Sequence, residues 1–202
     1  MKPQYFVFDL AGVLLNWNPE PFYRQHFCGD SDRFDHFFTH VFDDNAQTAI
    51  SAGESVNRVI DRLVEAHPDY DSAIKAYREH WHDMLPGEIG GTVAAFGELR
   101  ERGYPVFALG NWSREEFEWA QSRFAFLNTF DQVLLSGDCG YLKPDDRIFE
   151  LAETRFGVDP ASTVFIDDRP ENVHAAIARG WNGIVFENPR QLYLVLMEYN
   201  IL

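Results

Sequence analysis

Five short runs of apolar residues are the clearest pattern along the chain. Each run contains consecutive hydrophobic residues rather than an alternation of apolar and polar ones, and β-branched or aromatic side chains recur in all of them. Strands that are buried on both faces of a parallel sheet have this pattern. We therefore predict strands over residues 5–8, 106–109, 133–135, 164–166 and 184–186.

Patterns typical of amphipathic helices separate the last four runs. They cover residues 92–102 and 113–123, and the second opens with Ser113 and Glu116 in the spacing of a capping box. Two further helices are predicted to open at Pro144 and Pro170. Strands that alternate with helices predict an α/β fold with a doubly wound, mostly parallel sheet.

One segment breaks this alternation. Between about residues 15 and 85 no strand-like run occurs, and apolar residues, many of them aromatic, recur at helical spacing. We predict an all-helical cap domain over residues 15–90, inserted into an α/β core formed by residues 1–14 and 91–202. Hinges near Leu15-Asn16 and residues 86–91 would let the cap move over the strand ends.

Composition narrows the class of partner. The chain has 17 basic and 32 acidic residues, a net charge of −15, which disfavours nucleic acid and membrane surfaces as partners. Its only cysteines, Cys28 and Cys139, fit free thiols in a reducing cytosol. The first residues resemble neither a signal peptide nor a membrane span, so we expect a cytoplasmic protein.

Polar residues stand at or shortly after the ends of four predicted strands. They are Asp9 after the first, Gly110 and Asn111 after the second, Lys143 a short loop after the third, and Asp167 and Asp168 after the fourth. Ligands of open parallel sheets bind outside the carboxyl ends of the strands. A carboxylate can act as a covalent nucleophile, carboxylate oxygens suit Mg²⁺, and a lysine can neutralise a transferring phosphoryl group.

These motifs give the chain a specific resemblance. Residues 8–13, 109–111, 143–144 and 165–168 resemble, in order, the four motifs of the haloacid dehalogenase-like (HAD) hydrolase superfamily. The helical insertion between the first two motifs resembles the type C1 cap of its subfamily IA. The resemblance implies a Rossmann-like core and a Mg²⁺-dependent hydrolase that acts on a small phosphorylated metabolite.

The resemblance also assigns roles to residues of this chain. It implies that Asp9 is the catalytic nucleophile and that Lys143 is the catalytic charge-neutralising lysine. Asp9, Asp167, Asp168 and the backbone carbonyl of Ala11 would hold Mg²⁺, with Asp168 the preferred direct ligand. From the sequence alone, one of the two neighbouring aspartates could instead cap the helix that follows them.

The substrate side is less sharply defined. We expect Gly110, Asn111 and Trp17 to contact substrate, although the segment around Trp17 could equally be a hinge into the cap. His36 and His40 have the spacing of a metal-binding pair on a helix, but no third ligand is evident, so we interpret them as a surface face.

Two departures from the family pattern leave the chemistry open. Phosphatases of the family usually carry a second aspartate where this chain has Ala11, and usually a serine or threonine where it has Gly110. A phosphatase that forms an aspartyl-phosphate on Asp9 is the first hypothesis. A 2-haloacid dehalogenase, which needs no proton for its leaving halide, is the second. A catalytically silent binding or regulatory protein is the third.

Overall fold

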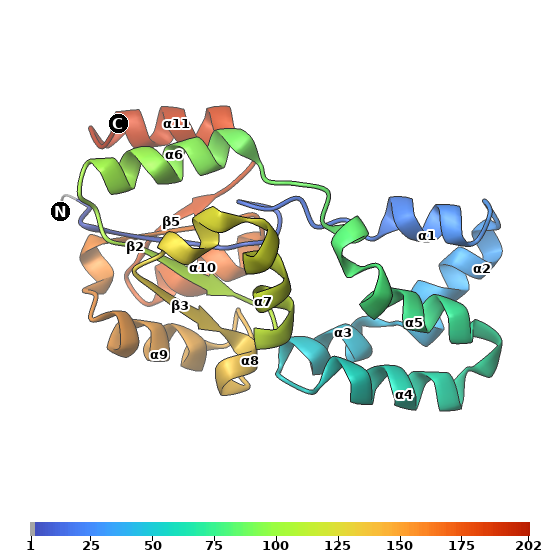
Figure 1. The fold of residues 1–202 in the computed structure, drawn as a ribbon. Coiled ribbons are helices and arrows are strands. Elements are labelled where there is room, and N and C mark those ends of the chain that lie inside the picture. The colour runs from blue at the N-terminus through green and yellow to red at the C-terminus, as the bar shows by residue number, and fades with distance from the viewer. Residues whose placement is uncertain (1–2) are drawn as a thin grey trace.

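Five parallel strands form one sheet in the order β3-β2-β1-β4-β5 (Figure 1). The computed structural model describes residues 3–202. The strands are β1 (Tyr5–Phe8), β2 (Val106–Gly110), β3 (Gln132–Leu135), β4 (Thr163–Asp167) and β5 (Asn182–Val185). Each overlaps a predicted run, and the predicted α/β fold class with a parallel sheet is confirmed.

Helices cover both faces of this sheet, which explains why the strands lack polar alternation. Phe6 and Phe8 of β1 pack into one apolar cluster, whereas Val7 points to the opposite face and into a second. The helices of the first face are α6 (Gly90–Glu101) and α11 (Pro189–Glu198), and those of the second are α9 (Asp146–Phe156) and α10 (Pro170–Ala178).

The predicted capping box is present at α7 (Arg114–Arg123). The Ser113 hydroxyl accepts a hydrogen bond from the Glu116 backbone N–H at 3.1 Å, and the Ser113 N–H donates to the Glu116 carboxylate at 3.0 Å. This exchange satisfies backbone groups that the first turn of a helix leaves without partners. The helix predicted at Pro170 also begins at that residue.

One helical prediction needs correction. The helix expected from Pro144 begins at Asp146, because the carboxylate of Asp145 accepts a hydrogen bond from the Arg147 N–H at 2.9 Å and so caps the first turn. Two further helices were not predicted, the last helix α11 and the single turn α8 (Ser136–Cys139) that follows β3.

The segment between β1 and α6 is helical, as expected, and lies to one side of the sheet (Figure 1). Its core is aromatic: the rings of Tyr23 and Phe37 lie 4.8 Å apart. Its elements are α1 (Glu20–His26), α2 (Ser31–His36), η1 (Phe37–Val41), α3 (Asp44–Ser51), α4 (Val56–Ala66), η2 (Pro68–Tyr70), α5 (Asp71–Glu79) and η3 (Trp81–Met84). We keep residues 15–90 as the proposed extent of the cap.

Two short 3-10 turns, η4 (Ala125–Thr129) and η5 (Pro160–Ser162), complete the described elements. No helix within residues 3–202 combines the length and the apolar character that crossing a membrane requires.

Candidate active site

The register between β1 and β4 brings two aspartates together. Phe8 pairs with Ile166, and the Asp9 N–H donates to the Ile166 carbonyl at 2.9 Å. The next residues of the two strands, Asp9 and Asp167, therefore lie side by side at the carboxyl edge of the sheet. β1 is the central strand, and the chain winds from it first towards β3 and then towards β5, so this edge is the crevice where ligands of such sheets bind.

Lys143 joins the two carboxylates. Its Nζ donates to Asp9 Oδ1 and to Asp167 Oδ2, each at 2.7 Å, and all three side chains are buried. The backbone of Lys143 is held by Asn111, whose Nδ2 donates to the Lys143 carbonyl at 2.9 Å and whose Oδ1 accepts from the Lys143 N–H at 2.8 Å. Asn111 thus positions the lysine as well as lining the cavity.

The two neighbouring aspartates have different surroundings. Both oxygens of Asp167 are engaged, because they accept hydrogen bonds from Lys143, from Asn172 Nδ2 and from the Arg169 N–H. Asp168 is exposed and its carboxylate lies against Gly12, where an added Cβ would collide with it. Gly12 has a φ of +83°, a conformation that suits glycine. Of the pair, Asp168 is the carboxylate that is open to the cavity.

Burial and charge set the protonation of this site. Burial raises the pKa of Asp9 to about 7, although attraction to Lys143 opposes the shift. Burial alone would lower the pKa of Lys143, but its two carboxylate partners raise it above its usual value. Burial and the neighbouring charge of Asp167 raise the pKa of Asp168. The site therefore gathers more negative charge than its single lysine neutralises.

A divalent cation would relieve this excess of negative charge. Asp9, Asp167 and Asp168 can each offer a carboxylate oxygen within 4.8 Å of the others, and no other such group of acidic, histidine or cysteine side chains occurs in residues 3–202. Within the same described residues, no hydrogen bond reaches the carbonyl of Ala11. This all-oxygen donor set fits Mg²⁺. His36 and His40 do not belong to it.

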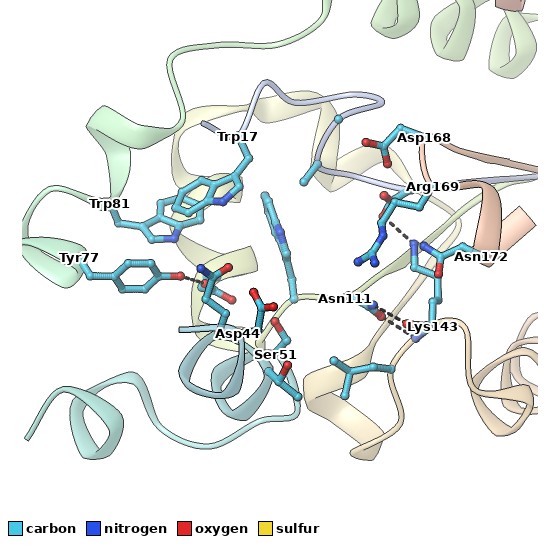
Figure 2. Close-up of a pocket in the computed structure, with 18 residues that line it drawn as sticks. Trp17, Asp44, Ser51, Tyr77, Trp81, Asn111, Lys143, Asp168, Arg169 and Asn172 are labelled. Atoms are coloured by element: carbon cyan, nitrogen blue, oxygen red, sulfur yellow. Dashed lines mark hydrogen bonds and ion pairs between the residues drawn. The ribbon is translucent and has the colours of Figure 1, made fainter. Parts of the chain in front are cut away.

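A cavity of about 530 Å³ opens in front of these groups (Figure 2). Most of the predicted site residues line it: Asp9, Ala11, Trp17, Asn111, Lys143 and Asp168. Arg169, at the same end, lines it as well, and its Nε donates to Glu171 at 2.7 Å. Sequence reasoning missed Arg169, although it directly follows the fourth motif.

The cap supplies the far wall of the cavity. Helix α3 contributes four polar side chains, and aromatic residues from the cap and from the loop after β2 complete the wall. Trp81 lies between two of these, with its ring centroid 5.1 Å from that of Trp17 and 5.7 Å from that of Trp112. The polar residues are Asp44, Gln47, Thr48 and Ser51. Their spacing of three, four and seven positions places them on one face of α3, a face that in the sequence alone looks like an ordinary solvent-exposed one.

A buried hydrogen bond ties the cap to the sheet domain beside this wall. Tyr77 Oη of α5 donates to Glu116 Oε1 of α7 at 2.6 Å (Figure 2). Burial raises the pKa of Glu116, and burial together with Glu116 raises that of Tyr77, so the phenol keeps its proton. The indole N–H of Trp81 lies near this pair and slightly lowers the pKa of Glu116, yet it has no acceptor in hydrogen-bonding geometry.

Residues 3–180 match the family model described as haloacid dehalogenase-like hydrolase. The chain belongs to this family of hydrolases. Flavin mononucleotide hydrolase 1 of Arabidopsis thaliana is 40% identical over 62 residues, which are 31% of this chain and 25% of that protein. The (S)-2-haloacid dehalogenase of Pseudomonas sp. (strain YL) is 32% identical over 69 residues, which are 34% of this chain and 30% of that protein. Each match thus spans less than a third of the relative's length.

A solved structure extends the likeness over nearly the whole fold. A HAD family enzyme from Bacteroides thetaiotaomicron, in complex with magnesium and inorganic phosphate, is similar to this chain with a TM-score of 0.67 at 21% identity. The superposition covers 92% of this chain and 95% of that one. This likeness shows that the HAD-like hydrolase shares the other enzyme's fold.

The two departures from the family pattern have different positions in this HAD-like hydrolase. Ala11 lines the cavity beside Asp9, whereas Gly110 is buried in β2 and does not line it. A Cβ added at Gly110 would lie 2.9 Å from Leu10 Cδ1 and 3.6 Å from Leu135 Cδ2. The structure therefore places Gly110 behind the cavity wall, and its predicted contact with substrate finds no support in this placement.

Proposed function

We propose that this HAD-like hydrolase is a Mg²⁺-dependent phosphatase that acts on a small phosphorylated metabolite. The observation that carries the proposal is the lysine-bridged pair of Asp9 and Asp167 with the open carboxylate of Asp168 beside it. A phosphoryl group carries two negative charges, and a cation held by these three carboxylates would offset them.

Each residue has a distinct task in this proposal. The Asp9 oxygen that Lys143 does not hold attacks phosphorus, the bond from phosphorus to the ester oxygen breaks, and an aspartyl-phosphate forms. Lys143 holds the nucleophile in place and offsets charge on the phosphoryl oxygens, while Asp167 fixes Lys143. Mg²⁺, held by Asp9, Asp168 and the Ala11 carbonyl, would supply further charge stabilisation. Water then attacks the aspartyl-phosphate and releases phosphate.

Proton transfer is the weak point of this cycle. The departing alkoxide needs one proton, and the methyl group of Ala11 cannot supply it. We infer that the proton comes from water, from the substrate or from a residue of the cap. We therefore expect turnover to depend strongly on how readily the alcohol leaves.

Relatives support both this function and its rival. The Arabidopsis relative is named as a flavin mononucleotide hydrolase, and the Bacteroides neighbour holds magnesium and inorganic phosphate. The Pseudomonas relative is named as a haloacid dehalogenase. Ala11 favours the dehalogenase, since a halide leaves without a proton. The open carboxylate of Asp168 favours the phosphatase, and we give it more weight because it adds a negative charge that an anionic haloacid would meet without compensation.

A substrate panel with and without Mg²⁺ tests the proposal. It should contain p-nitrophenyl phosphate, several phosphorylated metabolites and (S)-2-chloropropionate, each assayed with the native protein and with Asp9→Asn. We expect phosphate release that requires Mg²⁺ and that Asp9→Asn abolishes. Chloride release without Mg²⁺ would establish the dehalogenase instead, and inactivity on the whole panel would favour the silent binding protein.

A further inference from the structure

One face of α3 forms a polar wall of the cavity. Its four lining side chains, a carboxylate, an amide and two hydroxyls, recur at positions i, i+3, i+4 and i+7 and therefore lie on one side of the helix. Their neighbours Asp43 and Asn45 bond to each other at 2.8 Å and lie outside the cavity lining. Within the described residues, the four lining side chains make no hydrogen bond with the protein, so they are free for a ligand.

Aromatic surfaces border this polar face. Trp17 is half-buried and Trp112 is 7% exposed, and both line the cavity. Trp81, 1% exposed, packs against both indoles and holds them in place. Figure 2 shows Trp17, Trp81, Asp44 and Ser51 at one end of the cavity, and Asp168, Arg169 and Lys143 at the other. A ligand whose phosphate lies at the charged end would place its remaining part among tryptophans and α3.

The chemistry of this second end narrows the substrate class. An indole offers a flat apolar surface, whereas α3 offers donors and acceptors along about two helical turns. A pyranose or furanose ring matches both, since its C–H groups form an apolar face and its hydroxyls project from the edge. A ligand whose non-phosphate part is purely aromatic would leave the polar side chains of α3 desolvated and without hydrogen-bond partners, which costs binding free energy.

The charge on α3 narrows the class of substrate further. Asp44 is the only charged side chain among the four of α3, and its carboxylate accepts hydrogen bonds. A second phosphate or a carboxylate placed there would be repelled, whereas hydroxyl groups would donate to it. The part of the substrate outside its phosphate group should therefore be uncharged and rich in hydroxyl groups.

We propose that the substrate is the phosphate monoester of a small sugar, bound with its ring against Trp17 and Trp112 and its hydroxyls on the polar face of α3. This inference rests on the proposed phosphatase function and names its substrate class. Gln47 and Thr48, in the middle of the face, are then residues that determine specificity rather than catalytic residues.

The test compares substrates across matched variants. Gln47→Leu and Thr48→Val remove hydrogen-bonding groups at nearly constant size. Gln25→Leu in α1 and Thr154→Val in α9 make the same changes outside the cavity lining. The substrates are glucose 6-phosphate, ribose 5-phosphate, AMP, flavin mononucleotide, 3-phosphoglycerate and p-nitrophenyl phosphate. Because nitrophenolate leaves without a proton, p-nitrophenyl phosphate serves only as the reference, and among the metabolites we expect the sugar phosphates to give the highest kcat/KM.

Each cavity variant should lower kcat/KM for the sugar phosphates by about three- to tenfold, the range expected from one lost hydrogen bond. The value for p-nitrophenyl phosphate should change by less than about twofold, and the control variants should leave every substrate unaffected. Asp44→Asn should selectively raise the low activity on 3-phosphoglycerate, because it removes the repelling charge.

Preference for AMP or flavin mononucleotide would overturn the inference, as would an equal loss on all substrates in Gln47→Leu and Thr48→Val. Calorimetry separates this failure from that of the proposed function. Binding of glucose 6-phosphate to the Asp9→Asn protein with Mg²⁺, weakened by Gln47→Leu and not by Gln25→Leu, would support the sugar site even if no turnover occurred. Absence of both turnover and binding would refute it.

Discussion

The hydrogen bond from Tyr77 to Glu116 should hold the helical cap against the sheet domain, and Tyr77→Phe tests this directly. The bond joins α5 to α7 at 2.6 Å, and both side chains are buried. Phenylalanine keeps the ring, which packs 4.5 Å from that of Phe42. The substitution therefore removes the hydroxyl and little else.

The expected cost follows from the surroundings of the bond. A net hydrogen bond contributes about 0.5–1.5 kcal/mol, and about 1.5–3 kcal/mol when one partner is charged. Glu116 keeps its bonds to Ser113 through Oε2, at 2.9 Å to the hydroxyl and 3.0 Å to the N–H, but Oε1 would lose its donor in a buried place. We expect Tyr77→Phe to lower the free energy of unfolding by about 2 kcal/mol, a change of roughly 30-fold in the equilibrium constant.

Urea denaturation followed by tryptophan fluorescence measures this change, and Trp17, Trp81 and Trp112 report on the interface itself. Tyr193→Phe is the matched control. Its hydroxyl donates to Glu98 at 2.9 Å in a half-buried setting between α11 and α6, away from the cap. We expect it to cost less than about 1 kcal/mol. Hydrogen exchange should accelerate in α5 of Tyr77→Phe and remain unchanged in Tyr193→Phe.

A loss below about 0.5 kcal/mol for Tyr77→Phe, within the range of an ordinary surface substitution, would refute the reasoning. It would mean that water readily replaces the phenol and that the cap does not depend on this contact. Unchanged hydrogen exchange in α5 despite a large loss of stability would show that cap and sheet domain unfold together, without a separate opening step.

Four further outcomes are expected. Asp9→Asn should abolish turnover while its circular dichroism spectrum stays native, and retained Mg²⁺-dependent activity would disprove the nucleophile. Asp168→Ala should abolish calorimetric Mg²⁺ binding, and tight residual binding would place the cation elsewhere. Ala11→Asp should raise turnover of alkyl phosphates more than that of aryl phosphates, by up to roughly 10²–10⁴, and equal gains would show that proton transfer is not limiting. Burial raises the pKa of Glu116 above 4.5, so its contribution to stability is present below pH 4.5 and is lost as pH rises through the raised value. Glu116→Gln should therefore gain stability relative to the native protein as the pH rises above 4.5, and unfolding free energies of the two proteins that stay parallel across pH would contradict this.

The charged end of the site was predictable because its residues occupy strand ends. The runs before Asp9 and Asp167 predicted buried parallel strands, and parallel strands bring their carboxyl ends to one edge. Lys143 and Asn111 were also predicted to be site residues, but the sequence did not reveal that Asn111 holds the backbone of Lys143. That contact joins residues 32 positions apart and depends on the path of the loop after α8.

The cap end could not be predicted in the same way. Its aromatic residues at helical spacing predicted helices correctly, yet periodicity does not say which face of a helix meets the sheet domain. The polar face of α3 reads as an ordinary solvent face in the sequence, and only the position of the helix over the strand ends turns it towards the cavity. The hydrogen bond between Tyr77 and Glu116 could not be predicted either. The sequence identified Glu116 as a capping residue, but its second partner, Tyr77, comes from a distant part of the chain.

The two departures from the family pattern therefore differ in their consequences for chemistry. Ala11 lines the cavity, so a carboxylate placed there could reach the reacting group. Gly110 is packed against Leu10, and a serine there would first have to displace that side chain. In the proposed phosphatase, the phosphoryl oxygens would instead depend on Lys143 and Arg169, the positively charged side chains that line the cavity. The proposed phosphatase has neither a hydroxyl group at position 110 nor a carboxyl group at position 11, so it would depend on its remaining positive charges. Substrates with good leaving groups should therefore be turned over fastest.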